Sequence, residues 1–246
     1  MGAERPPSRR IVLERIELFL LVAPVLLMSM VAHEFAHGYA ALKQGDPTAQ
    51  QLGRLTWNPA RHIDPVMTVV LPLLTYFGGG LFGQPLIFGG AKPVPVDPRN
   101  YRSYRRGDII VSLAGVATNA VLAAVCTALI VVVGLVARLV PAASTPVALL
   151  QSMLITGISF NLVLVAFNLL PIPPLDGSHV VKHFLPRSLA EPYQRLGFYG
   201  MFIILALLWF GRGALMTWMH PAIVVFESAL RTVMPYVVPS PWTSIL

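Results

Sequence analysis

Long stretches without Asp, Glu, Lys or Arg dominate the pattern of hydrophobic and polar positions in this chain. Four such runs cover residues 65–91, 109–137, 147–175 and 196–211. A further apolar segment extends from about Ile16 to Leu42. Most of these runs are long enough to cross the hydrocarbon core of a bilayer, which needs roughly 20 apolar residues. The pattern therefore predicts a polytopic membrane protein.

The continuous apolar runs predict helices. Inside a bilayer every backbone polar group must be satisfied within a helix or a closed barrel, and these runs lack the alternation of a barrel strand. Residues 65–91 differ from the rest, because Pro72, Pro85 and repeated glycines interrupt them. We therefore expect an all-α fold with about five to six hydrophobic segments, one of which is a Gly/Pro-broken, re-entrant element.

The later segments predict the arrangement of the second half. Residues 109–137 and 147–170 are joined by a short turn with Pro141 and Pro146, so they should be antiparallel neighbours. A fifth segment begins near Leu196, and the tail after Arg212 is either a last crossing or an interfacial helix. We expect one membrane-embedded domain over residues 1–246, with its core at about 16–185 and C-terminal helices at about 196–238.

Composition supports the membrane class. Charged residues make up 12% of the 246 positions, against about 25% in soluble domains, and 55% are hydrophobic. Lys and Arg outnumber Asp and Glu by 18 to 11, an excess typical of membrane-flanking loops; it indicates a lipid bilayer and no nucleic acid as partner. The single cysteine, Cys126, excludes a disulfide framework and a Cys-based zinc finger.

The candidate chemistry lies in His33-Glu34-Phe35-Ala36-His37, toward the end of the first segment. Residues four apart share one face of a helix, so His33 and His37 can hold one metal ion, with Glu34 near the water that the metal activates. The alternative is two core histidines and a Glu at a helix end. An ionisable residue in an apolar span costs about 2.5–3.5 kcal/mol on insertion scales, so three of them within five residues favour a metal site.

A catalytic zinc site generally needs a third protein ligand, and Asp176 is the main candidate. It follows the fourth apolar segment, after Pro171, Pro173 and Pro174 and before Gly177. The prolines prevent an ordinary helix, and the glycine allows a sharp turn that would aim the carboxylate back toward a neighbouring helix. Two alternatives stay open: Asp176 as the N-cap of a helix starting at Ser178, and the rival ligands His179 and His183.

The two motifs together resemble the site-2 protease family of intramembrane zinc metalloproteases. They are His33-Glu34-x-x-His37 in a membrane span and, far downstream, Asn168-x-x-Pro171-x-Pro173-x-Leu175-Asp176-Gly177. The stretches Gly45-Asp46-Pro47-Thr48-Ala49 and Ala91-Lys92-Pro93-Val94-Pro95-Val96 look like the compact prokaryotic branch that lacks a PDZ domain. The resemblance covers about residues 31–181.

The resemblance implies a zinc-dependent endopeptidase that hydrolyses a peptide bond within or near a transmembrane helix of a membrane protein substrate. It implies one Zn²⁺ per chain, held by His33, His37 and Asp176, with Glu34 as the catalytic acid and base. The family also carries a small-residue motif ending in Asn, matched by residues 114–119 with Val116 where Pro is common. Asn119 would then be a catalytic contact to substrate or oxyanion; the equal alternative is a hydrogen bond that joins two helices.

The metal site also predicts topology. One ion can touch all three ligands only if the first and fourth segments run in the same direction, so residues 65–91 should make either no net crossing or two. Their Gly/Pro-broken composition favours a re-entrant element. Most Lys and Arg then share the side of the metal site, which the positive-inside rule makes cytoplasmic, in a multi-pass protein of a prokaryotic plasma membrane. The other function class is a non-proteolytic zinc-binding membrane protein, either a metal transporter or a scaffold. An intact Glu34 and the scarcity of polar groups in the third and fifth segments count against it.

Overall fold

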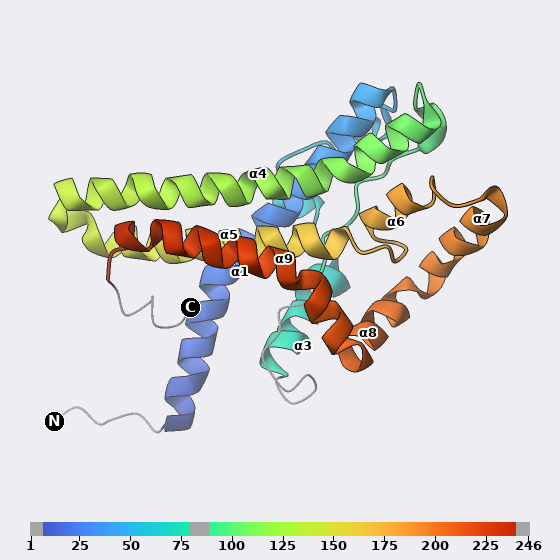
Figure 1. Ribbon diagram of the computed structural model, residues 1–246. Coiled ribbons are helices and arrows are strands. Elements are labelled where there is room, and N and C mark those ends of the chain that lie inside the picture. The colour runs from blue at the N-terminus through green and yellow to red at the C-terminus, as the bar shows by residue number, and fades with distance from the viewer. Residues whose placement is uncertain (1–6, 79–88, 240–246) are drawn as a thin grey trace.

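The computed structural model describes residues 7–78 and 89–239, and this part of the chain is helical, without strands (Figure 1). Three helices are long and apolar enough to cross a membrane: α1 (Pro7–Gln44), α4 (Tyr104–Leu139) and α5 (Ser144–Asn168). A fourth span results if the bent pair of 187–199 and 202–210, which meet at 77°, is taken as one crossing. The expectation of an all-α polytopic membrane protein is confirmed.

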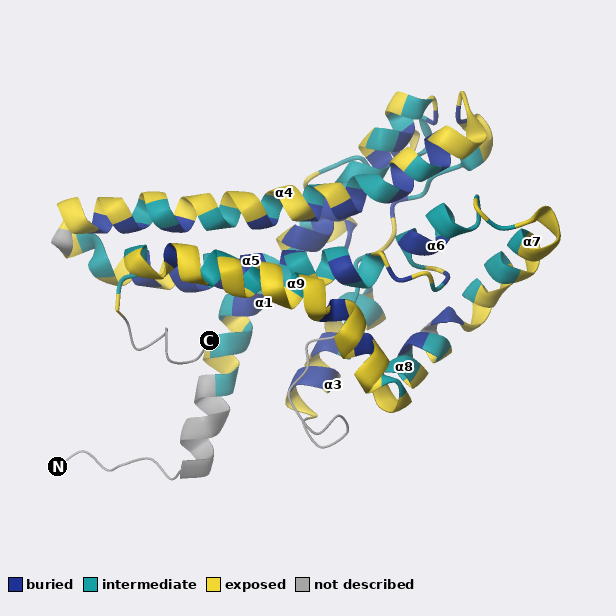
Figure 2. Ribbon diagram, in the orientation of Figure 1, coloured by how far each residue is buried: buried dark blue, intermediate teal, exposed yellow. Residues whose placement is uncertain are grey.

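Helices α4 and α5 form the antiparallel hairpin that the charge-free runs predict, with the short turn η4 (Pro141–Ala143) between them. Ile130 of α4 packs with Ile155 and Ile158 of α5 in a buried cluster, which Val233 completes from the C-terminal helix. Small residues allow close approach, and a side chain at Gly157 would lie 3.0 Å from Cys126 Sγ. The other side of α4 is largely exposed along its length, as expected for a surface that faces lipid (Figure 2).

The C-terminal part consists of α7 (Arg187–Arg195), η5 (Leu196–Tyr199), α8 (Gly200–Phe210) and α9 (Arg212–Val233). Helix α9 lies along α5, where Trp218 Nε1 donates a hydrogen bond to the carbonyl of Ala166 at 2.8 Å. Among the described helices, α9 is not one of those that meet the length and composition of a span. Its contact with α5 makes it part of the helical core.

The broken segment begins with a π-helix, η2 (Pro65–Val70), and continues as α3 (Leu71–Phe77). These thirteen residues are too few to cross a bilayer as a helix. Residues 79–88 lie outside the described part, but Gly90 returns to the start of the segment: its N–H donates to the carbonyl of Met67 at 3.0 Å, and its carbonyl accepts from Thr68 Oγ1 at 2.6 Å. The chain therefore leaves the segment at the end where it entered, as a re-entrant element does.

After the re-entrant element the chain passes α1 without regular secondary structure over residues 91–97. Arg54 Nη2 donates to the carbonyls of Lys92 and Pro93, at 3.0 and 3.2 Å, and holds this stretch in place. The buried carboxylate of Asp46 ties the loop after α1 to the same stretch by accepting from the backbone N–H of Asp97 at 2.6 Å. Burial raises the pKa of Asp46, but its hydrogen bonds from Thr48 and Asn100 outweigh this and hold the pKa below its usual range.

Candidate active site

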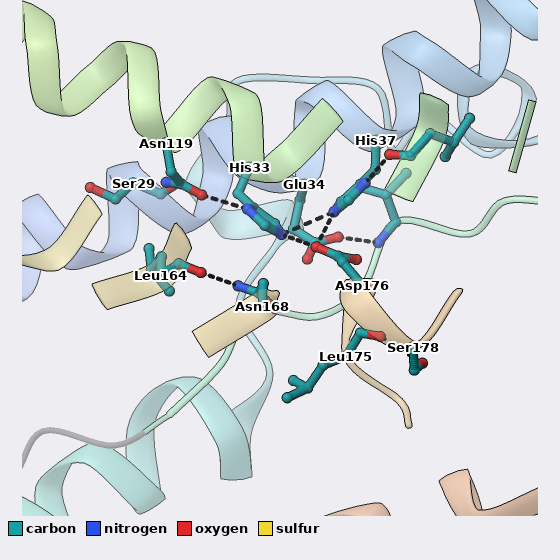
Figure 3. A network of polar contacts seen from close by, with 12 residues as sticks. Ser29, His33, Glu34, His37, Asn119, Leu164, Asn168, Leu175, Asp176 and Ser178 are labelled. Carbon is teal, nitrogen blue, oxygen red and sulfur yellow. Dashed lines mark hydrogen bonds and ion pairs between the residues drawn. The ribbon is translucent and has the colours of Figure 1, made fainter. Parts of the chain in front are cut away.

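Three side chains from two distant parts of the chain converge on one point (Figure 3). The Nε2 atoms of His33 and His37 are 2.9 Å apart. Asp176 Oδ2 lies 3.2 Å from His33 Nε2 and 3.3 Å from His37 Nε2. In the described part of the chain this is the one group of His, Cys, Asp and Glu with the spacing to hold a metal ion.

Two hydrogen bonds fix the orientation of the imidazole rings. His33 Nδ1 lies 2.5 Å from Asn119 Oδ1, and His37 Nδ1 lies 2.7 Å from the carbonyl oxygen of Val111. Carbonyl oxygens only accept hydrogen bonds, so both Nδ1 atoms carry the proton and both Nε2 atoms present a lone pair. Such outer partners are the usual means of orienting metal-binding histidines.

The arrangement fits a zinc ion. Two imidazole lone pairs and a carboxylate oxygen face one another with no proton to share, which is electrostatically unfavourable without a cation. In addition, Asp176 Oδ2 is buried and has no hydrogen-bond partner among the described residues. Four ligands at 2.0–2.1 Å from a tetrahedral zinc are separated by about 3.3 Å, close to the distances found. Three protein ligands leave one position open, as in catalytic zinc sites.

The local sequence explains how Asp176 reaches the histidines. It is the first residue of α6 (Asp176–Val181), with Leu175 at the N-cap, so the alternative that Asp176 caps a helix starting at Ser178 is wrong. A side chain at Gly177 would collide with the carbonyl of Leu169, so only glycine permits this close turn. The turn places Asp176 Oδ2 against the Nε2 atoms of both imidazole rings.

Gly115 of α4 makes room for both rings. A Cβ atom at this position would lie 2.5 Å from His33 Cε1 and 2.5 Å from His37 Nε2, well inside contact distance. The sequence showed Gly115 only as part of a small-residue motif. The structure gives the physical reason for the glycine: the two imidazole rings lie against α4 at this point, and a side chain would leave no room for them.

Asn119 lies behind His33 and is fully buried. Its Nδ2 donates to Asn161 Oδ1 at 2.7 Å, and Asn161 Nδ2 donates to Ser29 Oγ at 3.0 Å, so α1, α4 and α5 are joined. Of the two roles expected for Asn119, the structure shows the hydrogen bond between helices. A contact with substrate would require its amide to leave these partners. Asn161 was missed, although a polar side chain in a charge-free run is itself a signal.

Glu34 lies beside the three converging side chains (Figure 3). Its Oε2 accepts a hydrogen bond from the backbone N–H of Val94 at 2.7 Å. Val94 stands between Pro93 and Pro95, which have no N–H, so it supplies the one backbone donor of this three-residue stretch. The bond holds one carboxylate oxygen and leaves Oε1 without this constraint.

The rival ligands His179 and His183 lie elsewhere. His183 Nε2 is 2.7 Å from Asp108 Oδ2, and His179 Nδ1 is 3.8 Å from Asp108 Oδ1. They are part of a separate charged cluster and do not join the group of His33, His37 and Asp176.

Fold and site together define an all-α membrane protein with an H-E-x-x-H metallopeptidase motif whose histidines meet a distant aspartate. The model of peptidase family M50 matches residues 132–208, which include Asp176. A Bacillus subtilis (strain 168) protein named "Putative zinc metalloprotease YwhC" is 34% identical over 194 residues, covering 78% of this chain and 82% of that protein.

A second relative is the Mycolicibacterium smegmatis protein named "Putative zinc metalloprotease Rip2". It is 33% identical over 204 residues, covering 80% of this chain and 69% of Rip2. No solved structure matches the chain. The chain belongs to peptidase family M50, the site-2 protease family, and is a zinc-dependent metallopeptidase. The expected family membership is confirmed.

Proposed function

We propose that this metallopeptidase acts inside the membrane and hydrolyses a peptide bond within or near a transmembrane helix of another membrane protein. The observation that carries the proposal is the position of His33 and Glu34. Both belong to the part of α1, 15–44, that is long and apolar enough to cross a bilayer, and His33 is buried. A soluble substrate would have to enter the bilayer to reach them, whereas a transmembrane helix is already there.

His33, His37 and Asp176 would hold one zinc ion per chain. When bound, zinc supplies a Lewis acid that polarises the scissile carbonyl and lowers the pKa of water toward about 7. Asn119 and the Val111 carbonyl keep the Nε2 atoms directed at the site. We assign Asn119 this positioning role in place of the contact with substrate that the family resemblance implies.

Glu34 acts as the general base and then as the general acid. It accepts the proton of the attacking water and donates it to the leaving amine nitrogen. The Val94 N–H restrains Oε2, so that Oε1 is the oxygen available for the proton. A peptide bond in a helix is already hydrogen-bonded and shielded, so the substrate must unwind locally before attack.

Cleavage of a candidate membrane substrate by the purified full chain tests this proposal. We expect product in the presence of zinc and none after treatment with a chelator. Glu34→Gln should retain zinc, since it removes no ligand, and should lower turnover by about 10²- to 10⁴-fold, because a positioned base is lost. Glu191→Gln, at an exposed ion pair with Arg195, is the matched control and should cleave as the wild type does. Wild-type turnover of Glu34→Gln would refute the assignment of the base.

We further propose that the chain lies in the cell membrane with its active site toward the cytoplasm. The C-terminal part of α1 and the start of α6 meet at the metal site, while the η4 turn lies at the far end of α4. Single cysteines at Gln50, Thr145 and Ser188, in a Cys126→Ala background, should therefore differ in their reaction with an impermeant thiol reagent. Thr145 should label from outside, and the other two only after the cytoplasmic side is exposed. Labelling of Gln50 and Ser188 from opposite sides would contradict the proposed topology.

A further inference from the structure

A second group of ionisable side chains lies next to the metal site but is not part of it. Asp108 of α4 is 3% exposed. Its Oδ2 accepts hydrogen bonds from Lys182 Nζ and His183 Nε2, each at 2.7 Å. The side chains of Lys182 and His183 are also largely buried, with 11% and 8% exposed. Neither of these partners, nor Asp108 itself, has a part in the chemistry described above.

This cluster connects the two elements on which the metal site is built. Asp108 lies one helical turn before Val111, whose carbonyl orients His37, and two turns before Gly115, against which both rings rest. Lys182 and His183 directly follow α6, the short helix that begins with Asp176. Helix α4 therefore contacts the histidines and, through Asp108, also anchors the end of α6.

Helix α6 depends on such an anchor. It has six residues, too few for an isolated helix to be stable. It follows a loop without regular helix, and the hydrogen bond from Ser178 Oγ to the Leu175 carbonyl is local to α6. The ion pair between Asp108 and Lys182 is a buried polar contact that joins the end of α6 to α4, beside the packing of the two helices. A buried charge is tolerated only with its partner in good geometry, so this contact strongly restricts where α6 can lie.

We infer that Asp108 is a positioning residue for the zinc ligand Asp176: through Lys182 and His183 it fixes α6 against α4, so that the Asp176 carboxylate meets the two histidines. The inference rests on the proposed function, because it concerns the same metal site. A second metal site is a poorer account of the cluster. The Lys182 ammonium already neutralises the carboxylate, and in the described residues these side chains do not form a group with metal-binding spacing.

The experiment is a double-mutant cycle on zinc affinity, measured by competition with a chromophoric chelator on the purified full chain. We compare the wild type, Asp108→Asn, Asp176→Asn and the double variant, with Glu191→Gln as control. Asp108→Asn should weaken zinc binding by about 10- to 100-fold, the usual effect of losing an outer partner of a ligand. In the Asp176→Asn background the same change should weaken binding by less than about twofold, because the ligand it positions is gone.

A conservative pair at His183 provides a second test that leaves the Asp108 charge in place. His183→Gln keeps a donor for Asp108 and should retain most of the zinc affinity, whereas His183→Leu should weaken it. Suppose that Asp108→Asn lowers zinc affinity equally in the wild type and in the Asp176→Asn background. This would show an effect on the fold alone and would overturn the inference. Wild-type zinc affinity in both Asp108→Asn and His183→Leu would also overturn it.

The wild type and Asp176→Asn separate the inference from the proposed function. Unchanged affinity in Asp176→Asn would refute the proposed ligand set and the inference with it. If Asp176→Asn loses zinc while Asp108→Asn and His183→Leu do not, the inference alone fails.

Discussion

Helix α4 carries a polar cluster in each half, and in both clusters a glycine lets a neighbouring group approach the helix closely. In the first half, Gly115 faces the rings of His33 and His37. In the second half, Gly134 faces the backbone carbonyl of Tyr236, from the stretch that follows α9, and the amide of Gln151 from α5. In both clusters, therefore, a glycine of the same apolar helix makes room for neighbouring polar groups.

They differ in whether their polar atoms are satisfied. Gln151 is fully buried, and its Nε2 donates to the carbonyls of Ile130 and Tyr236 at 3.1 and 2.9 Å, while its Oε1 accepts from Val238 N–H at 2.8 Å. Asp176 Oδ2, in contrast, is buried without a hydrogen-bond partner among the described residues. Buried polar groups are normally paired. The cluster around Gln151, whose amide is fully hydrogen-bonded, is thus explained by stability alone. The cluster at the metal site, with its unpaired Asp176 oxygen, requires a ligand.

The largest effect on this comparison is expected from Gly115→Ala. The added methyl group would displace both imidazoles, so zinc affinity should fall by at least about tenfold, comparable to the loss of an outer partner of a ligand. Metal analysis after gel filtration of the purified variant measures the loss. Gly134→Ala is the matched control, because it places the same methyl group on the same helix. It should disturb the Tyr236 stretch, lower the unfolding temperature and keep its zinc. Full zinc content in Gly115→Ala would mean that the rings do not rest on α4.

A smaller effect is expected from Gln151→Ala. The change removes the Nε2 donor to the carbonyls of Ile130 and Tyr236 and the Oε1 acceptor of Val238 N–H, and the free energy of unfolding should fall by about 1–3 kcal/mol. Thermal unfolding in detergent, followed by tryptophan fluorescence, measures it. Zinc content and cleavage should be unchanged at temperatures below the transition. A selective loss of zinc in this variant would show that the two clusters are coupled and would break the comparison.

Much of the fold could be predicted from the sequence, because charge-free runs of sufficient length have few alternatives in a bilayer. The α4–α5 hairpin lies where those runs and Pro141 place it. The glycines and prolines of residues 65–91 predicted an element that turns back, and in the described part of the chain Gly90 returns to Met67 and Thr68. His33, Glu34 and His37 were recognisable because their relation is local, within one turn of a helix. Asp176 was chosen as the candidate third ligand because of the unusual proline and glycine residues around it.

The partners of these residues could not be predicted. The carbonyl of Val111 and the N–H of Val94 belong to the backbone, so no residue type marks them. The pairing of Asn119 with Asn161 depends on how two helices are rotated against each other, which apolar runs do not determine. For the same reason the sequence offered His183 as a rival ligand, whereas its contact with Asp108 follows from the docking of α6 on α4.

The central claim is that His33, His37 and Asp176 hold one zinc ion. The most direct test is the zinc content per chain of the purified wild type and of His37→Ala and Asp176→Ala, determined by atomic emission on folded, monodisperse protein. We predict about one zinc per chain in the wild type and a large loss in both variants, because each removes one of only three protein ligands. Undiminished zinc in either variant would contradict the claim.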